Sequence, residues 1–272
     1  MIVSDKDYPV DFCAYTLFSS SKGNAAYIRC AENEILIDAG ACAKSIQTAL
    51  CSIGTDIKNI QAIFITHEHS DHIRGIPVIA KKYHIPVHIT NPSAAKLSAL
   101  LEDPSILITH PPLYELEIGR LHIHSFLTPH DSNMSVGYTV ELNIGNNRRI
   151  RISIATDIGH ISTEIRRELI GSDYVLLESN HDREMLITGN YPYMLKQRIL
   201  SPRGHLSNDD CAEMLCELAQ SGTRHVLLGH LSERNNTPEL AYSCCCAKLA
   251  QQTANFRFSF DVASPNHPTK LA

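Results

Sequence analysis

Several features that place a chain in a membrane, a secretory route or a disordered class are missing from this sequence. No stretch reaches the ~18 uninterrupted apolar residues that span a bilayer, and residues 1–12 lack the basic and then apolar order of a signal peptide. No repeat, low-complexity tract or Gly/Ser-rich linker divides the 272 residues. We therefore expect a single domain over residues 1–272, located in the cytoplasm and without a membrane partner. The sequence gives no oligomeric state.

Cysteine pairs at a metal-binding spacing are also absent, although the chain has nine cysteines. With no CxxC pair and an odd count, the thiols are expected to be free side chains in a reducing compartment, mostly buried as small hydrophobes. The 24 basic and 29 acidic residues give a net charge of −5. Such a chain is no general nucleic-acid binder, because neutralising phosphates favours a basic face. Apolar residues make up 43% of the sequence, enough for a sizeable core.

Short apolar segments occur in two groups along the chain, and each group is followed by segments whose apolar residues have helical spacing. The expected strands are residues 14–18, 25–30, 35–38, 62–66 and 86–90, then 120–127, 136–142, 149–155, 174–178 and 225–229. Helices are expected over residues 43–53, from about residue 71, after Pro92 and over 211–218. This pattern predicts an α/β (or α+β) fold in which two sheets pack face to face with helices outside.

The most informative residues are histidines. Residues 66–72 read THEHSDH and directly follow the expected strand 62–66, so His67, His69, Asp71 and His72 lie within six residues where a strand ends. Imidazole together with carboxylate suits Zn²⁺, Mn²⁺ or Fe. A polar loop that is rich in histidine by chance would rarely have three histidines and an aspartate at this spacing. We therefore predict that this segment binds metal.

Three further candidate ligands follow other expected strands. His130 comes after strand 120–127, Asp157 after strand 149–155, and His230 after strand 225–229. Each alone could be an ordinary surface or core residue. Because ends of neighbouring strands meet at the edge of a sheet, their common position favours one shared site.

Residues 36–40 (LIDAG), the HxHxDH segment and the later His, Asp and His, in this order, resemble the metallo-β-lactamase fold. The resemblance covers nearly the whole chain and implies a four-layer αββα sandwich with two divalent ions, Zn²⁺ or Mn²⁺ with Fe as a further candidate. The implied ligands are His67, His69 and His130 for one ion, Asp71, His72 and His230 for the other, and Asp157 as the bridge between them.

Four further segments resemble the YycJ/WalJ (VicX) branch of this family, which implies a 5′-to-3′ exonuclease acting on double-stranded DNA. They are residues 19–24 (SSSKGN), 177–182 (LESNHD), 204–208 (GHLSN), and 229–232 (GHLS) with 235–238 (NNTP). The third is also similar to the Gly-His-Ser-Thr segment of ribonuclease Z, except that Leu206 precedes the serine. The stretch 131–156 between His130 and Asp157 is too short for the substrate arm of ribonuclease Z. The stretch 158–229 likewise leaves no room for a β-CASP insertion.

His205 is a candidate catalytic residue for a different reason. Ser207, with Asp210 three positions on, forms a capping signature ahead of the helix expected over 211–218. The free N–H groups of a helix start bind phosphate readily, and a histidine beside them could protonate a leaving alkoxide. We therefore predict His205 as general acid and Ser207, Asn208 and His181 as phosphate-binding residues. A capping-loop histidine without a special role is the alternative.

These residues favour a metal-dependent phosphodiesterase with DNA as substrate, in which a hydroxide bridging two cations attacks phosphorus and Asp71 orients it. The alternative is a hydrolase of a small ester, thioester, lactone or cyclic phosphodiester, which the acidic net charge favours, or a ribonuclease. A third hypothesis, a metal-stabilised binding protein without turnover, fits a complete set of seven ligands poorly.

Overall fold

Two seven-stranded sheets form the centre of the structure, a computed structural model that describes residues 10–252 and 258–272. The first sheet has the order β14-β1-β2-β3-β4-β5-β6 and the second β13-β12-β11-β10-β9-β8-β7. The strands are β1 (Phe12–Ser20), β2 (Gly23–Cys30), β3 (Asn33–Ile37), β4 (Ile60–Phe64), β5 (Val87–Thr90), β6 (Leu107–His110), β7 (Glu115–Ile118), β8 (Leu121–Leu127), β9 (Val136–Asn143), β10 (Arg149–Ala155), β11 (Tyr174–Glu178), β12 (His225–Gly229), β13 (Ser259–Val262) and β14 (Thr269–Lys270).

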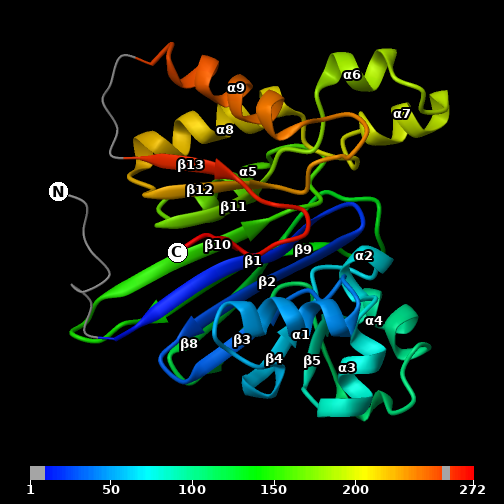
Figure 1. Cartoon of the computed structure of the whole chain (residues 1–272), viewed down its shortest axis with the longest axis vertical. Coiled ribbons are helices and arrows are strands. Elements are labelled where there is room, and N and C mark those ends of the chain that lie inside the picture. The colour runs from blue at the N-terminus through cyan, green and yellow to red at the C-terminus, as the bar shows by residue number, and fades with distance from the viewer. Residues whose placement is uncertain (1–9, 253–257) are drawn as a thin grey trace.

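Helices cover the outer face of each sheet (Figure 1). They are α1 (Ala43–Ser52), α2 (Ser70–Ile73), α3 (Ile76–Tyr83), α4 (Asn91–Ser98), α5 (Thr163–Leu169), α6 (Arg183–Thr188), α7 (Tyr193–Ile199), α8 (Asn208–Ser221) and α9 (Pro238–Leu249), with 3-10 turns at Ile57–Asn59 and Pro104–Ile106. Helices α1, α3 and α4 pack on the first sheet, and α5, α8 and α9 pack on the second. The predicted α/β fold with an αββα layer order is therefore confirmed.

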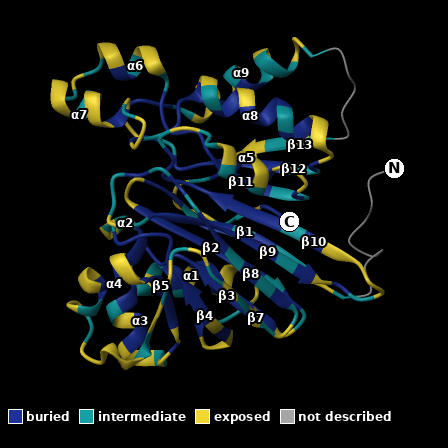
Figure 2. Ribbon diagram, turned by 180° about the vertical axis from the view of Figure 1, so that it is seen from behind, coloured by how far each residue is buried: buried dark blue, intermediate teal, exposed yellow. Residues whose placement is uncertain are grey.

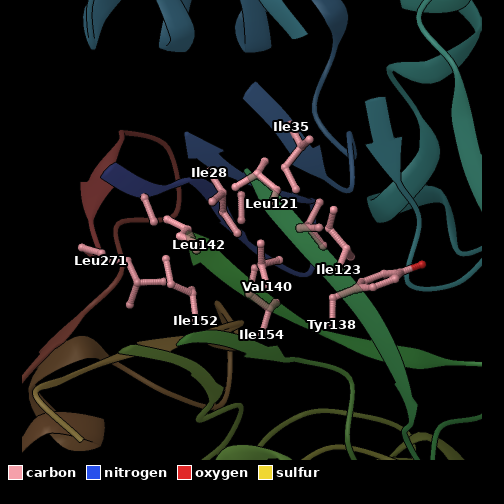
Figure 3. Close-up of a cluster of buried hydrophobic side chains, with 14 of the residues drawn as sticks. Ile28, Ile35, Leu121, Ile123, Tyr138, Val140, Leu142, Ile152, Ile154 and Leu271 are labelled. Atoms are coloured by element: carbon pink, nitrogen blue, oxygen red, sulfur yellow. The ribbon is translucent and has the colours of Figure 1, made fainter. Parts of the chain in front are cut away.

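The largest core lies between the two sheets, where β-branched and leucine side chains from both inner faces meet (Figure 3). Strand β4 shows how alternation divides its residues: Ala62 and Phe64 enter this core, whereas Ile63 packs against the helices of the first sheet, as does Ile65 just after the strand. Strands with both faces covered are almost entirely buried, as Figure 2 shows for the middle of the molecule. The sheets are thereby fixed relative to each other, and the loops at their edges stand on a rigid base.

The predicted strands 149–155, 174–178 and 225–229 match β10, β11 and β12 to the residue. The predicted helix from residue 71 is instead two helices, α2 and α3, with Gly75 between them. A side chain at Gly75 would meet the carbonyl oxygens of Ala41 and Ala39, at 2.5 and 2.9 Å from its Cβ, so only glycine allows this close approach. Pro77 then occupies the first turn of α3, where a missing N–H costs nothing.

The topology brings many strand ends to one edge. Strands β3 and β4 are parallel, as are β10, β11 and β12, and β8 runs in the same direction as β10 because both are antiparallel to β9. The residues that follow these strands therefore gather at one end of the sandwich, on the side where α2, α6 and α7 lie (Figures 1 and 2). Within residues 10–252 and 258–272, no helix combines the length and apolar character that a bilayer crossing needs.

Candidate metal centre

Sharp turns at the strand ends carry three polar residues into the site. Asp38, Asp157 and His230 each follow a strand and have a positive φ, of 63°, 57° and 56°. Residues other than glycine adopt this left-handed conformation at a cost, although Asp, Asn and His tolerate it best. Packing on both faces of the strands holds the turns in place. The buried side chains of all three residues point into the cluster described next.

Three histidines form the first half of the cluster. The ligand atoms of His67, His69 and His130 lie within 4.8 Å of one another. His67 and His130 are buried, and His69 is half-buried. The Nδ1 atom of His130 donates to the carbonyl oxygen of Gly204 at 3.1 Å, because a carbonyl can only accept. This contact leaves the lone pair of His130 on Nε2, which faces His69 Nδ1 at 3.3 Å.

The second half consists of Asp71, His72 and His230, whose ligand atoms also lie within 4.8 Å of one another. The carboxylate of Asp157 lies between the halves. Its Oδ1 is 3.6 Å from His130 Nε2, whereas its Oδ2 is 3.1 Å from His72 Nε2 and 3.3 Å from His230 Nδ1. One oxygen of Asp157 thus faces each half, which is the arrangement expected of a bridging ligand.

The donor atoms fit a pair of divalent cations. His67 Nε2, Asp157 Oδ2 and His230 Nδ1 are buried and have no partner in hydrogen-bond geometry within the described chain, although they face one another closely. Buried polar atoms are normally satisfied, so this convergence of buried nitrogen and oxygen atoms suits the binding of a cation. Imidazole and carboxylate are the donors that Zn²⁺, Mn²⁺ and Fe take in proteins. The described residues therefore contain a site for divalent metal.

A buried carboxylate outside the predicted set orients one of the candidate ligands. Asp38 Oδ2 accepts from His72 Nδ1 at 2.7 Å and from the Thr66 hydroxyl at 2.9 Å, while Oδ1 accepts from the Thr66 backbone N–H at 2.9 Å. In neutral His72, the proton on Nδ1 leaves the lone pair on Nε2, the atom that faces Asp157. On the opposite side, the Asn24 amide lies 3.1 Å from the same Nε2 and 3.3 Å from Asp71 Oδ2.

Charges within the cluster shift the pKa values of its members in opposite directions. Burial raises the pKa of Asp157, but the positive charges of His230 and His72 outweigh it and hold that pKa well below its usual range. Burial and the charge of His72 lower the pKa of His67 well below its usual value, so His67 is neutral and has a free lone pair. Burial also lowers the pKa of His72, yet Asp38, Asp157 and Asp71 raise it overall. Binding of a cation would therefore release a proton from His72.

His205 stands beside the metal cluster, paired with a carboxylate. Its Nδ1 donates to Glu178 Oε1 at 2.7 Å, and its ring stacks on that of His230 with centroids 5.4 Å apart. Burial lowers the pKa of His205, but the charge of Glu178 outweighs burial and raises the pKa to about 9. Glu178 is fully buried, and its Oε2 accepts from the backbone N–H of Ile158 at 2.7 Å. The pair thus holds a charged imidazolium whose Nε2 is left for other partners.

The three predicted phosphate-binding residues are used differently. Ser207 does cap α8, accepting from the Asp210 N–H, but the Asn208 N–H donates to the His181 carbonyl. The Asn208 side chain bonds to Ser179 and Asn236, and His181 is only 1% exposed. Two acidic residues also occupy the first turn of α8. The N–H groups of Asn208 and Asp210 are thus already engaged, and the side chains of Ser207, Asn208 and His181 are buried, so phosphate binding by these three residues stays a prediction without support from the geometry.

Sequence reasoning missed the roles of Asp38 and Glu178. Each carries a signal that could have identified it, because Asp38 directly follows the apolar residues 35–37 and Glu178 directly follows the apolar residues 175–177, where a buried carboxylate needs a partner. The seven predicted ligands, by contrast, are all brought together. Their metal-binding role stays a prediction, as does the role of Asp71 in orienting a nucleophile.

Comparisons with known proteins agree with this geometry. The family described as "Beta-lactamase superfamily domain" matches residues 33–231. The exodeoxyribonuclease WalJ of Streptococcus pneumoniae is 35% identical over 263 residues, which cover 94% of this chain and 95% of WalJ. The exodeoxyribonuclease YycJ of Bacillus anthracis is 32% identical over 261 residues, 94% of this chain and 96% of YycJ.

A solved structure extends the likeness to the fold. The metallo-β-lactamase fold protein YhfI from Bacillus subtilis has a TM-score of 0.69 at 13% identity, and the match covers 96% of this chain and all of YhfI. At that identity the likeness concerns the fold alone. Together with the family match over residues 33–231 and the similarity to WalJ and YycJ along nearly the whole chain, it shows that the chain belongs to the metallo-β-lactamase superfamily, in the YycJ/WalJ branch.

Proposed function

We propose that this protein is a metal-dependent phosphodiesterase that degrades double-stranded DNA from its 5′ ends. The observation that carries the proposal is the position of the His205–Glu178 pair, since a charged imidazolium stands directly beside a cluster of seven metal-ligand side chains. The relatives WalJ and YycJ, both named exodeoxyribonucleases, support DNA as the substrate.

Two divalent cations, Zn²⁺ or Mn²⁺, are proposed to occupy the cluster. His67, His69 and His130 would hold one, Asp71, His72 and His230 would hold the other, and Asp157 would bridge them. When bound, such ions supply an activated water at neutral pH and positive charge for the phosphate oxygens. The half-buried carboxylate of Asp71 is more exposed than that of Asp157 and is proposed to orient the nucleophile.

The chain's own residues supply the proton for the leaving group. The Nδ1–H group of His205 stays hydrogen-bonded to Glu178. The second proton of the imidazolium, on Nε2, is the one donated to the sugar oxygen as that oxygen departs from phosphorus. Glu178 is a positioning residue, because it fixes the ring and stabilises its charge without reaching the substrate itself. Proton donation matters for a sugar alkoxide, which is a poor leaving group.

The proposal is tested by offering the purified protein four substrates with Mn²⁺ or Zn²⁺: duplex DNA labelled at the 5′ end, duplex DNA labelled at the 3′ end, single-stranded DNA, and RNA. We expect early release of the 5′ label as a mononucleotide from the duplex. Preferred cleavage of RNA, or turnover of esters and thioesters without turnover of any nucleic acid, would overturn it.

A matched pair of variants excludes a contaminating nuclease. His69→Ala removes a predicted ligand and should abolish the activity. His122→Ala removes a histidine of β8 that contacts Glu115, outside the cluster, and should leave the activity unchanged.

A further inference from the structure

A cavity of about 130 Å³ opens next to His205. Its lining is partly apolar, with Tyr191, Leu195 and Ile199 from α7 and the residues just before it. The polar part includes Asn180 and Ser232, which lie in the loops after β11 and β12. The cavity therefore borders the metal cluster at His205, whose ring stacks on that of His230, and is walled on the other side by α7, which lies at the outer edge of the molecule (Figure 1).

The charged side chains that line this cavity already have partners of opposite charge, and the partner of His205 is the buried Glu178. Arg198 on α7 pairs with Asp131, and both line the cavity. A lining with a paired arginine and several apolar side chains fits a neutral planar group better than it fits a phosphate. Tyr191 is half-buried, and the guanidinium of Arg234 lies over its ring, 5.8 Å from the ring centroid. A cation over an aromatic ring is attracted by the ring's negative face, which helps to hold the ring in place.

We propose that this cavity binds the base of the departing nucleoside and that Tyr191 stacks on it, an inference that rests on the proposed function. A phosphoryl group is displaced in line, so the leaving oxygen departs on the side opposite to the attack. His205 protonates that oxygen and also lines the cavity, so the sugar and base attached to the oxygen enter the cavity. For cleavage from a 5′ end, that base is the terminal one.

Stacking also suits the activity. Every base has an aromatic face, so stacking on tyrosine retains a base without selecting its identity. A cavity for a single base beside the proton donor would set the length of the departing fragment at one nucleotide. The geometry thus assigns Tyr191 to substrate binding and to the mononucleotide product.

The test combines a variant with a modified substrate. Tyr191→Leu removes the ring and keeps apolar bulk, and the matched substrates are duplexes whose 5′-terminal nucleotide is either normal or abasic. Stacking of one base on an aromatic side chain corresponds to about a 5- to 150-fold effect. We expect Tyr191→Leu to lower kcat/KM for the first cleavage of the normal duplex by that factor. The abasic duplex should be cleaved slowly by the wild type, with no further loss in the variant.

Two controls separate stacking from a structural role. Tyr191→Phe keeps the ring and should cleave both duplexes at wild-type rates. Tyr193→Leu removes a tyrosine of α7 that is 70% exposed and does not line the cavity, and should also match the wild type. An equal loss on normal and abasic duplexes in Tyr191→Leu would overturn the stacking assignment while leaving the exonuclease function intact. A wild-type protein that cleaves neither duplex would overturn the proposed function and this inference with it.

Discussion

Replacement of Asp38 by Asn should weaken metal binding although Asp38 is not itself a ligand. In the wild type, Asp38 accepts from the Thr66 N–H, the Thr66 hydroxyl and His72 Nδ1, at 2.7–2.9 Å. Asn has one acceptor oxygen and one NH₂ donor. The backbone N–H of Thr66 can only donate, so the amide oxygen must stay there and the NH₂ group turns toward His72. His72 then has to accept at Nδ1, which moves its proton to Nε2, the atom that faces Asp157 at 3.1 Å.

A proton on Nε2 blocks the lone pair that a cation needs. Loss of such an orienting carboxylate typically costs 10- to 100-fold in metal affinity, about 1.4–2.7 kcal/mol. Asn also tolerates the left-handed backbone found at this position (φ 63°), so the turn itself should survive. We therefore expect the fold to persist and only the site that contains His72 to weaken.

The assay is a titration of metal-free protein with Zn²⁺ against a coloured chelator, which resolves the two affinities. The matched control is Asp56→Asn, which affects a carboxylate that caps the 3-10 turn Ile57–Asn59 and contacts Gln47, not the cluster. Affinities within about twofold of the wild type in a folded Asp38→Asn protein would show that Asp38 does not orient His72 for metal binding.

Asp157, the His205–Glu178 pair and His88 each give a further prediction, on metal occupancy, on cleavage and on stability against pH. Asp157→Ala should lower the occupancy of both metal sites, because one oxygen faces each half of the cluster; elemental analysis that still finds two ions per chain would remove the bridging assignment. His205→Ala and Glu178→Gln should slow DNA cleavage by roughly 10²–10⁴-fold while both metals are retained. Both variants should slow cleavage of a p-nitrophenyl phosphodiester far less, because a phenolate leaving group needs no proton. Equal losses on both substrates would contradict proton donation by His205. Burial and the nearby charge of His110 lower the pKa of His88 to about 4, so the stabilising effect of neutral His88 is complete above pH 6.5 and lost as the pH falls toward 4. Between pH 7 and pH 5 the free energy of unfolding of metal-free protein should fall by about 2 kcal/mol more in the wild type than in His88→Gln. Identical pH profiles of the two proteins would show that His88 has the same pKa in the folded and the unfolded chain.

The convergence of the seven predicted ligands could be foreseen from the sequence because their positions depend on local order. His130, Asp157 and His230 each follow a strand, and strands that run in the same direction bring such positions to one edge whatever the rest of the chain does. The orienting carboxylates were missed since their function depends on a tertiary partner. Glu178 meets His205 from 27 positions away, and Asp38 meets His72 from 34.

The short helices and the edge strands were not predicted, for a different reason. Helices α6 and α7 have six and seven residues, too few to show a helical period. Strands β6 and β7 lie at the sheet edges with half-exposed and exposed residues, so no apolar run marks them. At the helix start predicted to bind phosphate, a carbonyl from His181, distant in sequence, already accepts from the N–H of Asn208. Such competition for a donor is invisible in the sequence around residue 208.

We propose above that the cluster at the sheet edges is a two-metal centre that hydrolyses DNA. The most direct test is the rate of nucleotide release from duplex DNA, measured while metal-free protein is titrated with Mn²⁺ or Zn²⁺. The ligand set, three histidines in one half, Asp71 with two histidines in the other, and Asp157 between them, predicts no activity without metal and a plateau at two equivalents per chain. A plateau at one equivalent, or nucleotide release from protein that holds no metal, would contradict it.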